Sequence, residues 1–433
     1  MKPVNVGIIG FGTVGAGTVE LLLANKEIIT NRTGTDIIIK KIADLDIESD
    51  RGVSVDRSLM TTNAMDVIND PDIDVIVELV GGLTKAKEFV TGALENKKHV
   101  VTANKALLAE YGKELYETAF NNGVSLSFEA SVCGAVPIIG ALKNGLAPNH
   151  ISVIKGILNG TSNYILTRMT KEGLTYDQVV QKAVEMGFAE DPPTLDVNGT
   201  DAVHKLTILI SLLLGYPVAL QSIYREGIVN LTPDDIRFAD EFGYRVKLLA
   251  VARQRDNGIE ARVHPAMIPK DSILARVDDE FNAIYLEGDF VGPSLFYGLG
   301  AGRRPTASAV VSDIMGIARA MRLGYRGLMP PLSHFSLQKE VAIHSMEDLH
   351  SAYYFRFSAF DSPGVLSTIA GILGEHDISI SSVIQKGREQ NSSVPIVMLT
   401  HEAREKNVIE AVSKINRLDI VSGPTVMVRV EED

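Results

Sequence analysis

An aspartate and a lysine four residues apart are the first candidates for chemistry in this chain. Asp201 and Lys205 stand at the start of DAVHKLTILISLLLG, whose later part is almost wholly apolar. On a helix, residues four apart share one face, so we expect a polar first turn that opens onto a site. A lysine partly buried beside carboxylates can have its proton affinity tuned and can exchange a proton during carbonyl chemistry. The alternative is an exposed ion pair worth about 0.3–0.5 kcal/mol, and these two residues alone leave both readings open.

A second lysine lies where a strand is expected to end. In VVTANKALL, Thr102 and Lys105 follow an apolar run. Ligands of parallel sheets bind outside the carboxyl ends of the strands, so we expect Lys105 to point into the cofactor crevice and Thr102 to contact the cofactor. The alternative is a surface lysine that opens a helix, and the position of Lys105 favours the functional reading.

Three glycines with the spacing G-x-G-x-x-G occur in GIIGFGTVG, between an apolar run and a helical pattern. In that context Gly10 permits a tight turn, Gly12 lets the backbone approach a pyrophosphate, and Gly15 lets the helix pack on the strand. The free N–H groups of the helix start then bind the pyrophosphate. The expected cofactor contacts are Gly10, Gly12, Thr13, Val14 and Gly15. The alternative is a glycine turn without a ligand, which this strand-to-helix context disfavours.

The end of the second expected strand carries an acid. Asp44 there would accept hydrogen bonds from both ribose hydroxyls of NAD and would repel the 2′-phosphate of NADP. Lys40, Lys41 or Arg51 could still bind that phosphate. The cofactor preference is therefore open, with a lean toward NAD.

The segment FEASVCGAVPII combines an acid, small residues and the only cysteine of the chain. Glu129 followed by small residues predicts a tight loop whose carbonyl oxygens could hold a hard cation. Cys133 offers a competing chemistry, because a thiol could attack an aldehyde and form an acyl intermediate after hydride loss. Free cysteine is among the commonest buried residues, and no histidine neighbours Cys133 in the sequence. We therefore favour a structural role for the thiol.

The elements that would position these residues form an α/β pattern. Strands are expected at 4–10, 37–44, 75–80, 99–102 and 124–130, and helices at 13–26 and 84–96. The strands are apolar throughout, which is typical of a parallel sheet covered on both faces. We therefore predict a Rossmann-type domain in the N-terminal part of the chain.

From about residue 134 the expected strands mix polar and apolar residues, which predicts an α+β domain with an open mixed sheet. Strands are expected at 150–158, 261–268 and 282–289, and helices at 161–172, 175–187, 198–214, 232–240 and after Pro305. The tail repeats a βαββαβ order, the ferredoxin-like arrangement. The predicted domains are 1–133 (with about 305–325) for the dinucleotide, 134–304 for substrate and dimerisation, a linker at 326–349, and a regulatory domain at 350–433.

Composition narrows the class of protein. The net charge of −12 argues against nucleic acid or an anionic membrane as the main partner. The most apolar stretch, at 206–220, is broken by Gly215 and Pro217 and is too short to span a membrane. A single cysteine cannot form an intrachain disulfide, and no leader pattern is seen, so we expect a cytoplasmic protein.

Together these segments resemble the homoserine dehydrogenase family over residues 1 to about 325. The motifs that carry the resemblance are GIIGFGTVG, VELVGG, VVTANKALLA, FEASVCGAVPII, GILNGTSNYIL and the segment from Gly187 to Lys205. The tail, with DSPGVL after its first strand, resembles the ACT domain, which binds amino acids and regulates biosynthetic enzymes. With no kinase-like segment before it, the chain looks like the monofunctional form.

The resemblance implies reversible NAD(P)-dependent reduction of L-aspartate 4-semialdehyde to L-homoserine, on the route to threonine, methionine and isoleucine. It implies that Lys205 is the proton donor, Lys105 a second active-site lysine and Asp201 a catalytic carboxylate. The other implied sites are Glu190 and Gly187 for substrate, Gly302 as a late cofactor contact, and Glu129, Val132, Gly134 and Val136 for sodium. It further implies a homodimer or homotetramer and feedback inhibition, with threonine as the expected effector.

Two departures from the family pattern stand out. Many members have an arginine beside the aspartate after the second strand, and here Leu45 takes that place. The cation loop reads Val132-Cys133-Gly134-Ala135 where alanine and glycine are commoner. Two rival functions stay open at this stage: an acylating aldehyde dehydrogenase that uses Cys133, and an amino-acid sensor built on an inactive dehydrogenase scaffold.

Overall fold

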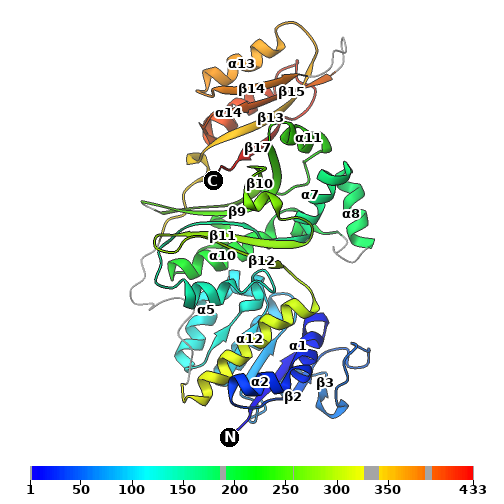
Figure 1. Ribbon diagram of the computed structural model, residues 1–433, viewed down its shortest axis with the longest axis vertical. Helices are drawn as coiled ribbons and strands as arrows, with labels where there is room; N and C mark the ends of the chain where they lie inside the picture. Colours follow the sequence, from blue (N-terminus) through cyan, green and yellow to red (C-terminus); the bar gives the residue numbers. More distant parts are fainter. Residues whose placement is uncertain (1, 186–191, 257, 326–340, 386–392, 433) are drawn as a thin grey trace. The chain divides into compact units, whose positions relative to one another are not determined.

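A computed structural model describes residues 2–185, 192–256, 258–325, 341–385 and 393–432 (Figure 1). The chain forms two compact units. Unit 1 contains residues 1–154, 201–222 and 281–341, and unit 2 contains residues 155–200, 223–280 and 342–433. We describe each unit by itself.

Unit 1 is built around a six-stranded sheet in the order β3-β2-β1-β4-β5-β6. Its strands are β1 (Val4–Ile9), β2 (Ile37–Ala43), β3 (Met60–Thr61), β4 (Val75–Glu78), β5 (His99–Thr102) and β6 (Leu126–Ser127). All neighbours pair in parallel. This strand order is that of a dinucleotide-binding Rossmann sheet, which confirms the predicted fold of the N-terminal region.

Helices cover this sheet. They are α1 (Thr13–Ala24), α2 (Lys26–Thr33), α3 (Met65–Ile68), α4 (Thr84–Glu95), α5 (Lys105–Asn122) and α12 (Arg303–Arg322), with a 3₁₀ turn at Arg57–Leu59. Although α12 is nearly 300 residues away in the sequence, it packs beside α1 (Figure 1). Val310 and Ile314 of α12 share one buried core with Val19 of α1 and Val6 of β1.

The last strand of the sheet is shorter than expected. A strand was predicted over 124–130, but β6 contains only Leu126 and Ser127, and a 3₁₀ turn (Glu129–Ser131) follows. The amide of Glu129 donates to a side chain of α12, Asp313, instead of to a neighbouring strand. The chain therefore leaves the sheet at that point and enters the loop that carries Cys133.

The rest of unit 1 consists of short turns, one long helix and a hairpin. The elements are α6 (Ile138–Gly140), a π-helical turn (Ala141–Gly145), α10 (Thr200–Leu214), a 3₁₀ turn (Leu220–Ser222), β11 (Phe281–Gly288) and β12 (Gly292–Leu299). β11 and β12 pair antiparallel along their whole length, from Phe281 opposite Leu299 to Gly288 opposite Gly292. β7 (Ile151–Ile157) carries the chain from unit 1 to unit 2.

Unit 2 begins with helices and a long hairpin. Its first elements are α7 (Gly160–Glu172), α8 (Tyr176–Glu185), α9 (Thr194–Val197), β8 (Tyr224–Arg225), α11 (Pro233–Glu241), β9 (Tyr244–Arg255), β10 (Gly258–Pro269) and a 3₁₀ turn (Ile273–Arg276). β9 and β10 pair antiparallel over twelve residues each. The helix predicted at 175–187 is α8, and residues 186–187 lie outside the described residues.

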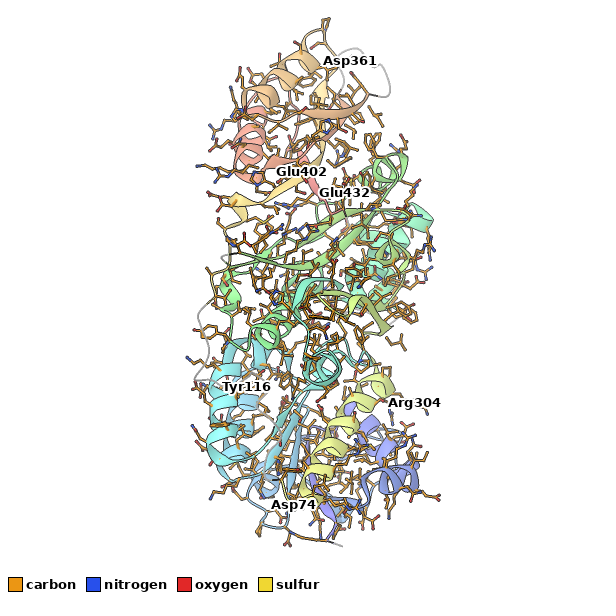
Figure 2. All side chains as sticks on the ribbon, turned by 60° about the vertical axis from the view of Figure 1, so that its left-hand side comes forward. Asp74, Tyr116, Arg304, Asp361, Glu402 and Glu432 are labelled. Atoms are coloured by element: carbon orange, nitrogen blue, oxygen red, sulfur yellow. The ribbon has the colours of Figure 1, made fainter. Side chains whose placement is uncertain are left out.

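The tail folds as βαββαβ. It comprises a 3₁₀ turn (Met346–Asp348), β13 (His350–Phe360), α13 (Val365–Glu375), β14 (Ile380–Gln385), β15 (Ser393–Thr400), β16 (Ala403–Arg404), α14 (Glu405–Ile415) and β17 (Val426–Val430). The strand order β17-β13-β15-β14 confirms the ferredoxin-like prediction. Figure 2 marks Asp361, directly after β13, and Glu432, two residues after the end of β17. α13 and α14 bury Ile369 and Val408 against Phe355 of the sheet.

Among the described residues, none of the helices has the length and apolar character needed to cross a bilayer.

Candidate functional site

Asp201 lies between two lysines. Its Oδ2 is 2.7 Å from the ammonium of Lys205, and its Oδ1 is 2.8 Å from the ammonium of Lys105. Asp201 and Lys205 are 5% and 7% exposed, whereas the side chain of Lys105 is 43% exposed. With both lysines protonated, the three groups carry one net positive charge. We call Lys105, Asp201 and Lys205 the lysine–aspartate site.

Two helix starts bring this site together. Asp201 and Lys205 belong to the first two turns of α10, one helical turn apart, and the residues that follow (Leu206, Ile208, Leu209) are buried. Lys105 is the first residue of α5, directly after β5. Asn104 caps that helix, because its side-chain oxygen accepts the Leu107 amide at 3.0 Å. The structure therefore places Lys105 at the carboxyl end of a parallel strand, where ligands of such sheets bind.

Cys133 is buried close to this site but is a poor nucleophile. Burial raises the pKa of its thiol to about 11, although the nearby ammonium groups of Lys205 and Lys105 act in the opposite direction. The side-chain amide of Asn282 donates to its sulfur at 3.5 Å. With this pKa the thiol is almost wholly protonated at neutral pH. Because the thiolate is the reactive form, this argues against covalent catalysis through Cys133.

The glycine loop has the shape that a dinucleotide needs. Gly10 has a φ of 101°, and a Cβ there would lie 2.8 Å from the Leu79 carbonyl. A Cβ on Gly15 would lie 2.1 Å from the carbonyl oxygen of Gly10, so α1 could not pack as closely with any other residue. A Cβ on Gly12 would meet nothing within 4 Å. Gly12 therefore leaves open space in front of the first turn of α1, where the amides of Thr13 and Val14 begin the helix.

Asp44 ties the glycine loop to the end of β2. Its carboxylate accepts the amides of Phe11 and Asp46. Each carboxylate oxygen keeps a second lone pair, so these bonds leave room for ribose hydroxyls. Leu45, the next residue, is 92% exposed.

Two of the basic residues near this end of the sheet, Arg51 and Lys41, have acidic partners. Arg51 pairs with Asp46 at 2.9 Å, and Lys41 pairs with Asp70 at 3.0 Å. The guanidinium of Arg303 donates to the carbonyl of Arg51 at 2.8 Å. Arg303 follows Gly302, the residue that caps α12 with a φ of 123°. These partners reduce the positive charge offered to a 2′-phosphate.

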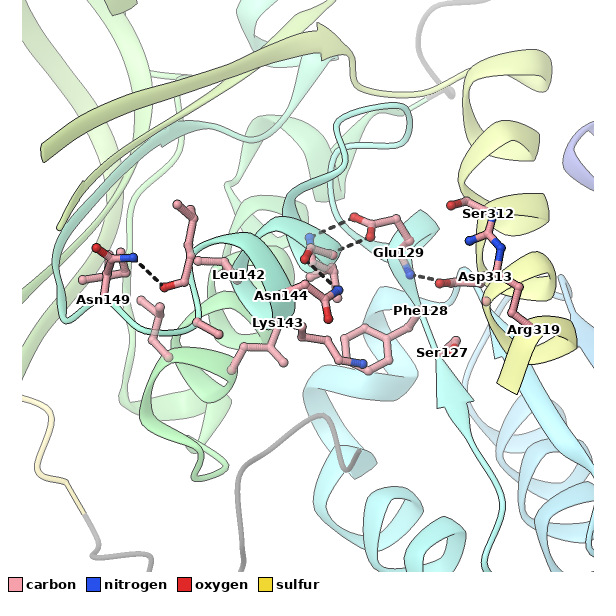
Figure 3. A pocket seen from close by; sticks show the side chains of 18 residues that line it. Ser127, Phe128, Glu129, Leu142, Lys143, Asn144, Asn149, Ser312, Asp313 and Arg319 are labelled. Atoms are coloured by element: carbon pink, nitrogen blue, oxygen red, sulfur yellow. Dashed lines mark hydrogen bonds between the residues drawn. The ribbon is translucent and has the colours of Figure 1, made fainter. Parts of the chain in front are cut away.

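Glu129 is used as a helix cap. Its two carboxylate oxygens accept the amides of Ile139 and Gly140 at 2.8 and 2.7 Å (Figure 3). Burial raises the pKa of Glu129, and these two hydrogen bonds oppose the shift. Its own amide donates to Asp313 at 2.8 Å, and burial raises the pKa of that carboxyl to about 7.

The loop after Glu129 exposes main-chain oxygen. Cys133 and Gly134 both have positive φ, at 54° and 47°, so the backbone turns sharply there. The Val136 carbonyl accepts the Ile138 amide at 2.8 Å, whereas no main-chain donor among the described residues reaches the carbonyls of Val132 or Gly134. Among the residues that the structure describes, no three or more His, Cys, Asp or Glu side chains are grouped to hold a metal. A cation here would therefore be held mainly by carbonyl oxygens.

A cavity of about 610 Å³ is lined by Glu129 and by residues that include Lys143, Asp313 and Arg319 (Figure 3). None of the three residues of the lysine–aspartate site lines it. The cavity is therefore separate from the candidate catalytic groups.

Four further residues bear on the candidate site: two expected substrate contacts that are not described, and two buried polar residues that the sequence did not predict. Gly187 and Glu190, the expected substrate contacts, lie outside the described residues. Asn282 and Glu78 were not singled out from the sequence, yet both are fully buried polar side chains next to site loops. Glu78 had a signal, an acid at the end of an otherwise apolar strand. Asn282 had none, because the sequence predicts a strand with one open face there, and polar residues are common in such strands.

Comparison with known proteins gives a consistent result along the whole chain. A family model described as homoserine dehydrogenase matches residues 137–315, its NAD binding domain matches residues 10–129, and an ACT domain matches residues 353–419. Homoserine dehydrogenases from Pseudomonas aeruginosa and Bacillus subtilis are 45% and 38% identical to the chain, with 99–100% of each protein covered. The solved structure of a homoserine dehydrogenase from Thiobacillus denitrificans is 44% identical, with a TM-score of 0.93 over 100% of this chain and 99% of that one. A hyperthermophilic archaeal homoserine dehydrogenase in complex with NADPH is 27% identical, with a TM-score of 0.63 over 73% of this chain and 97% of that one.

Proposed function

The chain belongs to the homoserine dehydrogenase family, and we propose that the lysine–aspartate site is where it interconverts L-aspartate 4-semialdehyde and L-homoserine. The observation that carries this proposal is the contact of Asp201 with both lysines, at 2.7 and 2.8 Å. Reduction of an aldehyde adds a hydride to carbon and a proton to oxygen, and negative charge builds on that oxygen between the two events. A cluster with one net positive charge is suited to stabilise it.

Each residue has a distinct part in this mechanism. The bound nicotinamide cofactor supplies the hydride. Lys205 holds a proton in a nearly buried position and delivers it to the substrate oxygen. Lys105, more exposed, stabilises the developing charge. Asp201 holds both ammonium groups in place, and its negative charge stays balanced by Lys105 when Lys205 has lost its proton. In the oxidation of homoserine, Lys205 accepts the hydroxyl proton instead.

The cofactor is proposed to lie against the glycine loop and the strand ends. The contacts would be Gly10, Gly12, Thr13, Val14, Gly15, Asp44, Thr102, Lys105 and Gly302. The open space at Gly12 fits a pyrophosphate. Asp44, exposed Leu45 and the paired state of Arg51 favour NAD over NADP.

We also propose a sodium ion at Glu129, Val132, Gly134 and Val136. The sharply turned backbone, and the Val132 and Gly134 carbonyls that receive no main-chain donor from the described residues, support it. Sodium would fix the loop that carries Cys133. It would not take part in the reaction.

The ACT domain suggests that an amino-acid effector binds in the tail. We propose threonine, and we place its site at the turn Asp361-Ser362-Pro363-Gly364, where Gly364 has a φ of 92°. Such domains usually act in pairs, so we propose a homodimer or homotetramer. The substrate contacts Glu190 and Gly187, the domain limits given above and a cytoplasmic location remain parts of this proposal.

Initial rates with homoserine test the proposed function, with NAD and NADP in separate arms and with threonine present or absent. We expect NAD(P) reduction that depends on homoserine, a higher rate with NAD, and inhibition by threonine. If no homoserine-dependent reduction of NAD or NADP is measured, the result would favour the alternative of an amino-acid sensor on an inactive scaffold. The intact lysine–aspartate site argues against that alternative. Heat release on threonine addition, measured by calorimetry, checks the effector separately.

A further inference from the structure

A buried acid lies at the end of β4, beside the strand end that leads to Lys105. Glu78 is the last residue of β4 and is 0% exposed. In the sheet it is flanked by Ile9 of β1 and Thr102 of β5. Both neighbouring positions are strand ends that open onto the expected cofactor crevice.

Hydrogen bonds connect Glu78 to the start of α5. Thr102 donates its hydroxyl to Oε2 of Glu78 at 2.5 Å, and the same hydroxyl oxygen accepts the Asn104 amide at 3.0 Å. Asn104 in turn caps α5, whose first residue is Lys105. Two residues, Thr102 and Asn104, thus connect the buried carboxylate to the lysine that contacts Asp201.

A second set of bonds connects Glu78 to the loop after its own strand. The amide of Val80 donates to Oε1 of Glu78 at 2.8 Å. The side-chain amide of Asn104 donates to the Gly82 carbonyl at 2.8 Å. The loop at residues 79–82 and the start of α5 are therefore held to each other and to one carboxylate.

No cation balances Glu78 in the described part of the chain. β1 carries no charged residue, and His99 of β5 lies at the opposite end of the strand, beside Val75. On α4, which packs on β4, Lys85 pairs with Glu88 and Lys87 with Glu114, while Lys105 of α5 pairs with Asp201. Burial accordingly raises the pKa of Glu78 to about 7, and the bonds from Thr102 and Val80 oppose the shift. An unbalanced buried carboxyl is costly, so simple packing is a poor reason for an acid at this strand end.

We propose that Glu78 is a positioning residue for the dehydrogenase reaction, whose ionised carboxylate sets the first turn of α5, and with it Lys105, through Thr102 and Asn104. The inference rests on the proposed role of Lys105. An ionised carboxylate accepts from both Thr102 and Val80. Once protonated, one of its oxygens becomes a donor, and either Thr102 or Val80 loses its acceptor. Turnover should then fall on the acid side as Glu78 gains its proton.

The test uses the full-length enzyme and the variants Glu78→Gln, Thr102→Val and Thr102→Ser. Glutamine keeps an acceptor for Val80 but presents an NH₂ group to Thr102, as the protonated acid would. Serine keeps the hydroxyl that valine removes. Glu95→Gln, an exposed acid at the end of α4, is the matched control. The measurements are kcat and KM between about pH 5.5 and 9, NADH binding by its fluorescence, and the melting temperature.

We expect Glu78→Gln and Thr102→Val to lower kcat by about 10-fold or more above the acid limb, and Glu78→Gln to keep KM and NADH affinity within about 3-fold of wild type. The acid limb of kcat near neutral pH should disappear in Glu78→Gln. Glu95→Gln should behave as wild type, and Thr102→Ser should recover most of the kcat that Thr102→Val loses. The double variant Glu78→Gln/Thr102→Val should be no slower than the slower single variant, because both act along one chain of bonds.

Other outcomes overturn the inference. Wild-type kcat and an unchanged acid limb in Glu78→Gln would show that the carboxylate does not act on the site. Equal losses in Thr102→Ser and Thr102→Val, with lowered melting temperatures, would show a structural role only. If Glu78→Gln does not fold, the serine and valine variants decide alone. Lys105→Met distinguishes a failure of the proposed function from a failure of this inference. Wild-type turnover in Lys105→Met would contradict the proposed function itself. A slow Lys105→Met enzyme together with a normal Glu78→Gln enzyme would contradict only the role of Glu78.

Discussion

Lys105 and Lys205 are bound by the two oxygens of one carboxylate, that of Asp201. The two lysines lie near the starts of different helices and differ in exposure, one nearly buried and one open to solvent. This difference fits the two roles proposed for them, because a buried ammonium is suited to exchange a proton and an exposed one to meet an arriving substrate. Asp201 keeps the two cations together despite their repulsion.

The first prediction concerns Lys205. Lys205→Met should lower kcat for homoserine oxidation by about 10²–10⁴-fold, the range for loss of a general acid–base group. Cofactor affinity should stay nearly unchanged, because Lys205 lies on α10 and outside the glycine loop. Steady-state kinetics and NADH fluorescence measure the two effects. Lys113→Met, an exposed lysine of α5, is the control, and wild-type turnover in Lys205→Met would remove Lys205 from the mechanism.

The second prediction concerns Cys133. Cys133→Ala should keep kcat within about 3-fold, because the buried, protonated thiol is not the reactive form. Iodoacetamide at neutral pH should label the folded enzyme slowly and the unfolded chain quickly, as followed by mass spectrometry. Loss of all activity in a folded Cys133→Ala enzyme, with rapid labelling of the native wild type, would favour the acylating mechanism instead.

The sequence predicted local relationships in the site better than distant ones. The pairing of Asp201 with Lys205 follows from helical spacing, and the glycine loop follows from its place between strand and helix. The contact of Asp201 with Lys105 joins residues 96 positions apart, and only the packing of α10 near the end of β5 creates it. Spacing along the chain carries no information about such a contact.

The fold shows the same division. The parallel sheet and the βαββαβ tail could be predicted because apolar runs and helical periodicity indicate each of their elements locally in the sequence. β12 was not among the expected strands, since Gly292, Pro293 and Gly298 weaken its strand pattern, and pairing with β11 supplies the order. The shortening of β6 was missed because its cause is a hydrogen bond from Glu129 to Asp313, 184 residues away.

The third prediction concerns a buried lysine of unit 2. Lys247 donates to the Val277 carbonyl at 2.5 Å, and burial lowers its pKa to about 8. Between that value and the ordinary lysine pKa the unfolded chain binds a proton that the folded chain does not, so folding becomes more favourable as pH rises. Relative to Lys247→Met, the wild-type free energy of unfolding should rise by about 2–3 kcal/mol between about pH 8 and 10.5 and stay level below.

Urea unfolding at several pH values measures this difference. Lys406→Met, an exposed lysine of α14 in the same unit, should show no such trend against the wild type. A wild-type advantage that falls as pH rises through this window would mean that the folded state holds the Lys247 proton more tightly than the unfolded chain, contrary to the burial argument.

The last prediction concerns the choice of dinucleotide. Leu45 is 92% exposed and directly follows Asp44, so an arginine there would reach the space beside the ribose without disturbing the core. Leu45→Arg should raise kcat/KM for NADP by about 10-fold or more, since a guanidinium binds a phosphate through paired hydrogen bonds, and change that for NAD by less than about 3-fold. Phe290→Arg, at a residue 91% exposed in the turn after β11, adds the same charge elsewhere and should leave the ratio unchanged. An equal gain in both variants would show that net charge alone sets the preference, and no gain in Leu45→Arg would mean that the 2′-phosphate lies away from the end of β2.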